Sequence, residues 1–156
     1  MSTAMTWETD STSSAQTERL AESLGRRLRG GEVIELTSDL GGGKTTFTRG
    51  LVRGTGSTDR VGSPTFTLSR EYTAPKFTVA HFDFYRLGEA GIMADELDEL
   101  IGDPAYVVVV EWGDIVHDVL PAGRLTVRFT LTGEEARRIT MTYPPGLEYL
   151  MEGLDA

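Results

Sequence analysis

The chain of 156 residues has no cysteine, only two histidines and only two lysines. Without cysteine it forms no disulfide and offers neither a thiolate nucleophile nor a thiolate metal ligand. The two histidines, His81 and His117, leave little for a zinc site. No run of the sequence approaches the roughly 20 apolar residues of a membrane span, and the N-terminus lacks the basic-then-apolar order of a secretion signal. These absences predict a protein of the reducing cytoplasm with no membrane anchor.

Basic residues are also in short supply. The chain carries 24 acidic and 15 basic residues, for a formal net charge of −9, which argues against a protein that coats nucleic acid. With 39% hydrophobic and 25% charged residues, the composition is that of a globular protein, and the length fits one domain. We expect a single α/β domain over residues 15–145, preceded by a flexible Ser/Thr-rich leader at residues 1–14 and followed by a C-terminal tail at residues 146–156.

Glycine, by contrast, is abundant, with 18 residues, and one glycine cluster lies between a strand-like and a helix-like segment. Apolar residues at helical spacing predict a helix from Ala15 to the Gly30-Gly31 pair, and a β-prone run predicts a strand over residues 32–37. A second helix is expected to begin at Lys44. Further along, the patterns predict two antiparallel hairpins, a strand buried on both faces and a short acidic helix. The two hairpins are expected at residues 65–72 with 77–85 and at residues 124–131 with 137–143. The buried strand is expected at residues 107–110 and the acidic helix at residues 94–102.

The segment 38–45 reads SDLGGGKT and fits the phosphate-binding loop G-x-x-x-x-G-K-[ST] at every position except the first, where Ser38 replaces glycine. Consecutive glycines let backbone N–H groups converge on phosphate oxygens, and the following helix points its positive N-terminus at the same place. Lys44 would reach the β- and γ-phosphates, and the Thr45 hydroxyl would bind magnesium. A flexible glycine turn beside a chance Lys-Thr pair is the alternative, but the position between a strand and a helix favours the phosphate loop. If the first position requires a positive φ, serine there costs about 1 kcal/mol or more.

A phosphate loop works with magnesium and with a carboxylate, usually at the end of a neighbouring buried strand. Glu111 directly follows four valines and is placed that way. Asp83 is the other candidate, because strand alternation puts His81, Asp83 and Tyr85 on one face. Either acid could instead be a solvated strand end, and Asp83 could pair with Arg86. His81 is expected to be a structural neighbour of the site and not a metal ligand.

The segment Ser63-Pro64-Thr65 lies between the helix after the loop and the next strand. Phosphate-loop proteins place residues that sense the γ-phosphate at this point of the chain. A Thr65 hydroxyl there would contact magnesium or the attacking water. A rigid turn that leads into the strand, which Pro64 supports, is the alternative.

The two lysines also bear on the nucleotide. Neither Lys44 nor Lys76 lies in the Asn-Lys-x-Asp element of guanine-specific GTPases, so ATP is favoured over GTP. A small-molecule kinase usually places an arginine-bearing lid over the phosphates, and it is the runner-up, although residues 88–118 contain no lysine or arginine. A third alternative is a nucleotide-gated binding module with no useful hydrolysis of its own.

Four motifs follow one another along the chain: DLGGGKTTFTRGL at 39–51, SPTFTL at 63–68, HFDFYRL at 81–87 and VEW at 110–112. Together they resemble the TsaE family, also called YjeE, the small ATPase component of bacterial tRNA threonylcarbamoyladenosine biosynthesis. The resemblance covers about residues 14–131, and the four motifs together are far more specific than the phosphate loop alone. Thr17 matches a threonine that the family carries near its nucleotide pocket. Where the family has Gly-Asp-Leu-Gly-Ala-Gly-Lys-Thr, this chain departs at Ser38 and Gly42.

The resemblance implies a phosphate-loop α/β domain of three layers, with a mostly parallel central sheet extended by antiparallel strands. It implies slow, partner-dependent ATP hydrolysis that requires Mg²⁺. The implied partners are TsaD and TsaB proteins, which transfer the threonylcarbamoyl group to adenosine beside the anticodon, so tRNA is reached only through them.

The resemblance also implies roles for individual residues. Thr45 and Glu111 would hold magnesium, Asp83 would be an essential carboxylate near the γ-phosphate, Thr65 would occupy a switch-like position, and Trp112 would lie at the edge of the site. The division of labour between Asp83 and Glu111 stays open, since either could bind magnesium through water. The implied nucleotide-binding residues are Thr17, Asp39, Leu40, Gly41, Gly42, Gly43, Lys44, Thr45 and Thr46.

The negative charge is concentrated in one part of the chain. Residues 83–118 contain ten acids and one arginine, whereas residues 41–70 contain five basic residues and one acid. The expected phosphate loop therefore lies in a basic neighbourhood. The acidic segment is either a solvated face or a docking surface for a basic partner.

Overall fold

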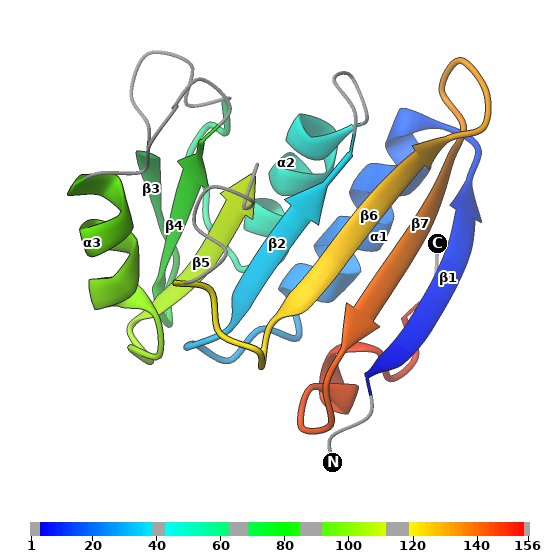
Figure 1. The fold of residues 1–156 in the computed structure, drawn as a ribbon. Coiled ribbons are helices and arrows are strands. Elements are labelled where there is room, and N and C mark those ends of the chain that lie inside the picture. The colour runs from blue at the N-terminus through cyan, green and yellow to red at the C-terminus, as the bar shows by residue number, and fades with distance from the viewer. Residues whose placement is uncertain (1–3, 39–42, 63–68, 85–91, 112–118, 155–156) are drawn as a thin grey trace.

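The computed structural model describes residues 4–38, 43–62, 69–84, 92–111 and 119–154. Within them the chain forms a seven-stranded mixed sheet with three α-helices (Figure 1). The strands are β1 (Met5–Ser11), β2 (Val33–Thr37), β3 (Ser69–Thr73), β4 (Thr78–Asp83), β5 (Tyr106–Glu111), β6 (Leu125–Leu131) and β7 (Arg137–Tyr143). The helices are α1 (Ser14–Gly25), α2 (Lys44–Gly54) and α3 (Ile92–Leu100), with a short 3-10 helix, η2, at Glu148–Leu150.

The middle of the sheet is parallel and its two margins are antiparallel. The strand order is β1-β7-β6-β2-β5-β4-β3; β6, β2, β5 and β4 run parallel, whereas β7, β1 and β3 pair antiparallel with their neighbours. The predicted α/β class, with a mostly parallel centre and antiparallel extensions, is confirmed. Parallel strands end at the same edge of a sheet, so the carboxyl ends of β2, β4 and β5 lie together, beside the start of α2 (Figure 1).

The strand β5 lies between two hydrophobic cores. Val107 and Val109 pack in the core that α1 and α2 cover, Val108 and Val110 pack in the core that α3 covers, and all four are at most 1% exposed. The run of valines predicts this burial on both faces. The strand therefore carries Glu111 directly from the interior to the edge of the sheet.

Two predictions for the N-terminal part are wrong. Residues 1–14 were expected to form a flexible leader, but Met5–Ser11 pair with β7 as an edge strand. Half-buried and exposed residues alternate along this segment, as in a strand with one face against the protein. Thr and Ser dominate residues 1–14, so the alternation does not show as apolar and polar residues in the sequence. The first helix also ends at Gly25, before the Gly30-Gly31 pair. Beyond it the N–H groups of Arg27 and Leu28 bond the carbonyls three residues back, which is a tighter turn than that of an α-helix.

The described part of the C-terminal tail packs against the domain. Leu150 and Leu154 are 0% and 8% exposed and belong to the core covered by α1 and α2. The hydroxyl of Tyr149 donates a 2.5 Å hydrogen bond to the carboxylate of Glu32. Burial and this carboxylate raise the pKa of Tyr149, so the phenol remains a donor and ties the tail to the loop that leads into β2. In the parts of the chain that the structure describes, no helix has the length and apolar character needed to cross a bilayer.

Glycine lets α1 and α2 pack very close together. A Cβ atom on Gly50 would lie 2.2 Å from the carbonyl oxygen of Glu18, and one on Gly54 would lie 2.1 Å from that of Glu22. Both distances are far inside van der Waals contact. Arg53 adds a 3.0 Å salt bridge to Glu18 across the same interface. The two helices are therefore held in one relative position, which places the N-terminus of α2 against the sheet.

Replacing Gly50 with alanine tests this packing. We expect Gly50→Ala to lose about 1–3 kcal/mol of unfolding free energy, because the added methyl group forces two backbones apart, although alanine has the higher helix propensity. Urea unfolding followed by circular dichroism measures the change. Gly123→Ala is the matched control, since nothing lies within 4 Å of a Cβ at that position. Equal stability of the two variants would contradict the close helix contact.

Candidate functional site

The helix α2 begins where the glycine-rich segment ends. Gly43 precedes its first turn with φ of 101°, a left-handed conformation that glycine adopts without strain. Lys44 is 8% exposed, and Thr45 and Thr46 are half-buried in the first turn. Within the described residues no side chain caps this helix. The N-terminal end of a helix carries the positive end of its dipole, which favours an anion. The remaining predicted loop residues, Asp39 to Gly42, lie outside the described residues.

Both predicted carboxylates lie on the face of the sheet that α2 covers. Asp83 is opposite Glu111 across the β4–β5 pair, and Glu111 is opposite Leu36 of β2; Leu36 belongs to the core beneath α1 and α2. Glu111 is 4% exposed and Asp83 is half-buried. The expectation that His81 and Asp83 share one face of β4 is confirmed by the contact of His81 with Glu111.

The Glu111 carboxylate is held by His81. Its Oε2 contacts Nε2 of His81, and the imidazole is 1% exposed. The ring of Tyr72 lies beside the imidazole, with 6.3 Å between the ring centroids. The Tyr72 hydroxyl donates a 3.1 Å hydrogen bond to the carbonyl of Gly62, and burial raises the pKa of Tyr72, so the phenol stays protonated. The sequence did not single out Tyr72, because only the pairing of β3 with β4 brings it beside His81.

The predicted nucleotide contact Thr17 is buried near the start of α1, at 2% exposed. Its hydroxyl lies 2.6 Å from Oγ of Ser11, and Ser11 donates a 2.9 Å hydrogen bond to the carbonyl of Ser13. A role of Thr17 in nucleotide binding stays a prediction. The roles predicted for Thr65, Tyr85 and Trp112 also stay predictions, because these three residues lie outside the described ranges.

Arg137, the first residue of β7, reaches the same end of α2. A Cβ atom on Gly43 would lie 3.8 Å from Nε of Arg137. The guanidinium also donates a 2.9 Å hydrogen bond to the carbonyl of Ala136 in the turn before β7. Arg137 therefore adds a cation beside the glycine-rich segment. No local motif in the sequence signals this residue, because the sheet, and not a nearby stretch of chain, brings β7 to the site.

The donor atoms at this site fit magnesium better than a metal bound by protein alone. Among the described residues, no group of three or more histidine, aspartate or glutamate side chains is arranged to hold a metal ion. Glu111 offers one carboxylate and Thr45 one hydroxyl. Mg²⁺ is commonly bound by one or two such protein oxygens together with the phosphates of a nucleotide. The residues present therefore fit magnesium that arrives with a phosphate ligand.

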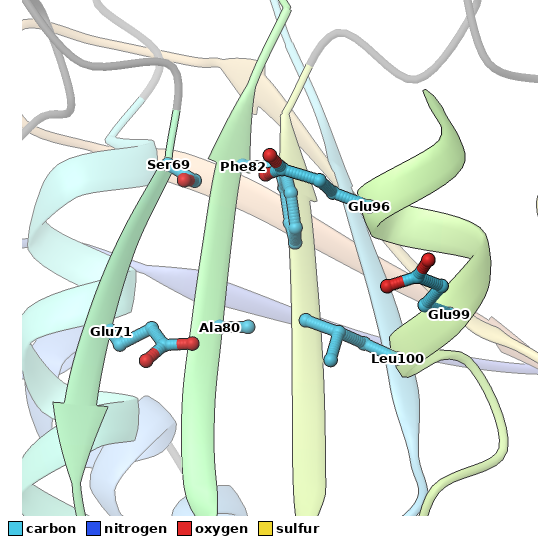
Figure 2. Close-up of a pocket in the computed structure, with 7 residues that line it drawn as sticks. All are labelled: Ser69, Glu71, Ala80, Phe82, Glu96, Glu99 and Leu100. Carbon is cyan, nitrogen blue, oxygen red and sulfur yellow. The ribbon is translucent and has the colours of Figure 1, made fainter. Parts of the chain in front are cut away.

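A separate acidic hollow of about 170 Å³ lies on the opposite face of the sheet. It is bounded by β3, β4 and α3, with the carboxylates of Glu71, Glu96 and Glu99 around it (Figure 2). Phe82 lines it and is 2% exposed. Neighbouring residues of a strand point to opposite faces, so His81 and this hollow are on different sides of β4. The hollow is not part of the Glu111 site, and its carboxylates repel phosphate.

Comparison with known proteins gives a consistent result. The sequence model of one family, described as threonylcarbamoyl adenosine biosynthesis protein TsaE, matches residues 11–139. The tRNA threonylcarbamoyladenosine biosynthesis protein TsaE of Bacillus subtilis is 37% identical over 131 residues, which cover 81% of this chain and 79% of that protein. The protein of the same description from Treponema pallidum is 35% identical over 134 residues, which cover 84% of this chain and 96% of that protein.

The fold agrees as well. The crystal structure of YdiB from Bacillus subtilis superposes with a TM-score of 0.78 at 33% sequence identity, covering 99% of this chain and 95% of that chain. The family that the four motifs predicted is confirmed, and the chain belongs to the TsaE family of threonylcarbamoyl adenosine biosynthesis proteins.

Proposed function

We propose that this chain is the ATP-binding and ATP-hydrolysing component of the tRNA threonylcarbamoyladenosine machinery. One observation carries the proposal: Glu111 and Asp83 lie on the face of the sheet that α2 covers, at the edge where β2 leads into the glycine-rich segment and Lys44. A strand, a glycine-rich segment and a helix in this order, with an acid at the end of an adjacent strand, are the working parts of phosphate-loop ATPases. Membership of the TsaE family supplies the pathway.

In this proposal the chain first binds the phosphates. Backbone N–H groups from Gly41 to Thr46 surround them, and the ammonium group of Lys44 neutralises charge on the β- and γ-phosphates. Arg137 supplies a second cation at the same end of α2, next to Gly43. Thr17 contributes to the nucleotide pocket from α1.

Thr45 and Glu111 hold magnesium together with the phosphates. Bound there, Mg²⁺ neutralises the charge that develops on the transferring phosphoryl group. Glu111 suits this role because it is buried and its Oε2 is already held by His81. A carboxylate fixed in this way loses little conformational freedom when its other oxygen takes a ligand.

Asp83 orients the attacking water. It lies opposite Glu111 at the end of β4 and is the more exposed of the two acids, as a group that meets incoming water should be. Thr65 contacts the γ-phosphate or the same water from the segment before β3. This assignment gives the metal to Glu111 and the water to Asp83, a division that the sequence left open.

TsaD and TsaB type proteins are the proposed partners, and tRNA is reached only through them. The net charge of −9 disfavours direct binding of tRNA by this chain. The acidic hollow beside α3 lies on the face away from the phosphate site, where a partner can approach without blocking the nucleotide. We place the protein in the cytoplasm, where tRNA is modified and used.

Lys44→Ala tests the nucleotide site. Each hydrogen bond from a charged group is worth about 1.5–3 kcal/mol, so the loss of two such bonds to phosphate lowers ATP affinity more than roughly 100-fold. Isothermal titration calorimetry measures the affinity, and circular dichroism checks the fold. Lys76→Ala is the matched control, because Lys76 is the other lysine of the chain and is exposed in the β3–β4 turn. An unchanged ATP affinity in Lys44→Ala would refute the nucleotide site.

Turnover in the presence of the partners tests the two carboxylates. We expect Mg²⁺-dependent release of phosphate from ATP that rises when TsaD and TsaB type proteins are added. Asp83→Asn should still bind ATP and lose at least about 100-fold in turnover, the usual contribution of a group that activates the nucleophile. Glu111→Gln should still bind ATP and lose turnover because magnesium is no longer held against the phosphates. Glu8→Gln, an exposed acid on β1, is the control.

The same assay separates the alternatives. Equal turnover in the wild type and the two carboxylate variants would refute the assigned roles. Transfer of labelled γ-phosphate to a small metabolite would indicate a kinase instead. Partner binding that responds to ATP, without any release of phosphate, would indicate a nucleotide-gated binding module.

A further inference from the structure

We infer that His81 is a positioning residue for the Glu111 carboxylate, with Tyr72 as its support, and that this pair sets how strongly the site binds magnesium with ATP. The inference rests on the proposed function of Glu111. It extends that function to two residues that would not themselves contact metal or nucleotide.

The contact with His81 engages one carboxylate oxygen and leaves the other for a ligand. Oε2 of Glu111 meets Nε2 of His81, and both side chains are at most 5% exposed. Oε1 of Glu111 takes no part in the contact with His81. A buried carboxylate that is tied at one oxygen presents the other in a single direction. Outer-shell hydrogen bonds of this kind tune metal affinity in many proteins.

The second nitrogen of the imidazole argues against a merely structural role. A carboxylate only accepts hydrogen bonds, so Nε2 carries the proton that faces Glu111. In the described part of the chain Nδ1 of His81 is buried without a hydrogen-bond partner. A buried polar atom left unpaired lowers stability. An apolar side chain of similar size would avoid that cost but would leave the buried Glu111 carboxylate without its partner. His81 is therefore explained by what Nε2 does for Glu111.

Tyr72 keeps the imidazole in place from the side of β3. Its ring is tilted by 36° against that of His81, and Tyr72 is 2% exposed. The hydroxyl is fixed by its bond to the Gly62 carbonyl. The position of Glu111 thus depends on a chain of contacts that runs from β5 through β4 and β3 to Gly62.

Substitutions at His81 separate positioning from structure. His81→Leu removes the donor and the unpaired nitrogen and keeps an apolar group. We expect this variant to be less stable than the wild type, because the buried Glu111 carboxylate loses its partner, and to bind ATP in EDTA with unchanged affinity where circular dichroism shows that it is folded. The gain in ATP affinity on adding MgCl₂ should fall roughly 10-fold, the low end of the cost of removing such an outer-shell partner. Calorimetric titration of ATP in both buffers gives the two affinities.

Two further variants make the test independent of the folding of His81→Leu. The amide nitrogen of glutamine can reach the place of Nε2, whereas that of the shorter asparagine cannot. His81→Gln should therefore keep most of the Mg²⁺-dependent gain, and His81→Asn should lose it. Tyr72→Phe should lose part of the gain, while Tyr143→Phe, a half-buried tyrosine on β7, serves as its control.

A spectroscopic measurement reports on the ring directly. The chain has only two histidines, so long-range ¹H–¹⁵N spectra of the imidazoles can be assigned with the His81→Gln variant. We expect the Nε2–H tautomer for His81. The Nδ1–H tautomer would overturn the inference, because the nitrogen facing Glu111 would then have no proton to donate.

The outcomes distinguish this inference from the proposed function. A wild type whose ATP affinity does not respond to Mg²⁺ would refute the proposed magnesium site. A wild type that responds, together with a His81→Leu or His81→Asn variant that responds equally, would leave the magnesium site standing and overturn the role of His81.

Discussion

A carboxylate that stands at the end of a strand buried on both faces must have a partner, and the contact between Glu111 and His81 meets that need. Four valines carry β5 through the interior and deliver Glu111 to the edge of the sheet almost without exposure to water. An unpaired charge in such surroundings is strongly unfavourable. The neighbouring strand β4 supplies His81, and two residues later it supplies Asp83 on the same face. The arrangement of acids that the proposed chemistry uses therefore follows from the pairing of two strands.

The other half of the site depends on how closely two helices pack. The glycines of α2 let its backbone lie against that of α1, so Lys44 at the start of α2 and Thr17 near the start of α1 are set by one rigid contact. The register of β1 with β7 places Ser11, the hydrogen-bond partner of Thr17, opposite Arg137. This half of the site thus draws its groups from α1, α2, β1 and β7, and the fold brings these elements together without any single long motif.

The sequence predicted the features that depend on neighbouring residues. The valine run, the glycine-rich segment before Lys44 and the alternation around Asp83 are local patterns, and each led to the correct element. The N-terminal strand was missed, because Thr and Ser in residues 1–14 conceal its period of two, and its partner β7 lies at the other end of the chain. Tyr72 and Arg137 were not identified as neighbours of the site for the same reason. Their positions depend on which strands pair, and on the sheet order that places β2 between β5 and β6.

We propose that the chain supports threonylcarbamoyladenosine formation through a nucleotide bound at Lys44. The most direct measurement is the content of threonylcarbamoyladenosine in tRNA, by mass spectrometry of nucleosides, from cells that lack their own TsaE protein and express this chain or its Lys44→Ala variant. The wild-type chain should restore the modified nucleoside, and the variant, at equal protein level, should not. Full restoration by the variant would contradict the claim that nucleotide binding at this site carries the function.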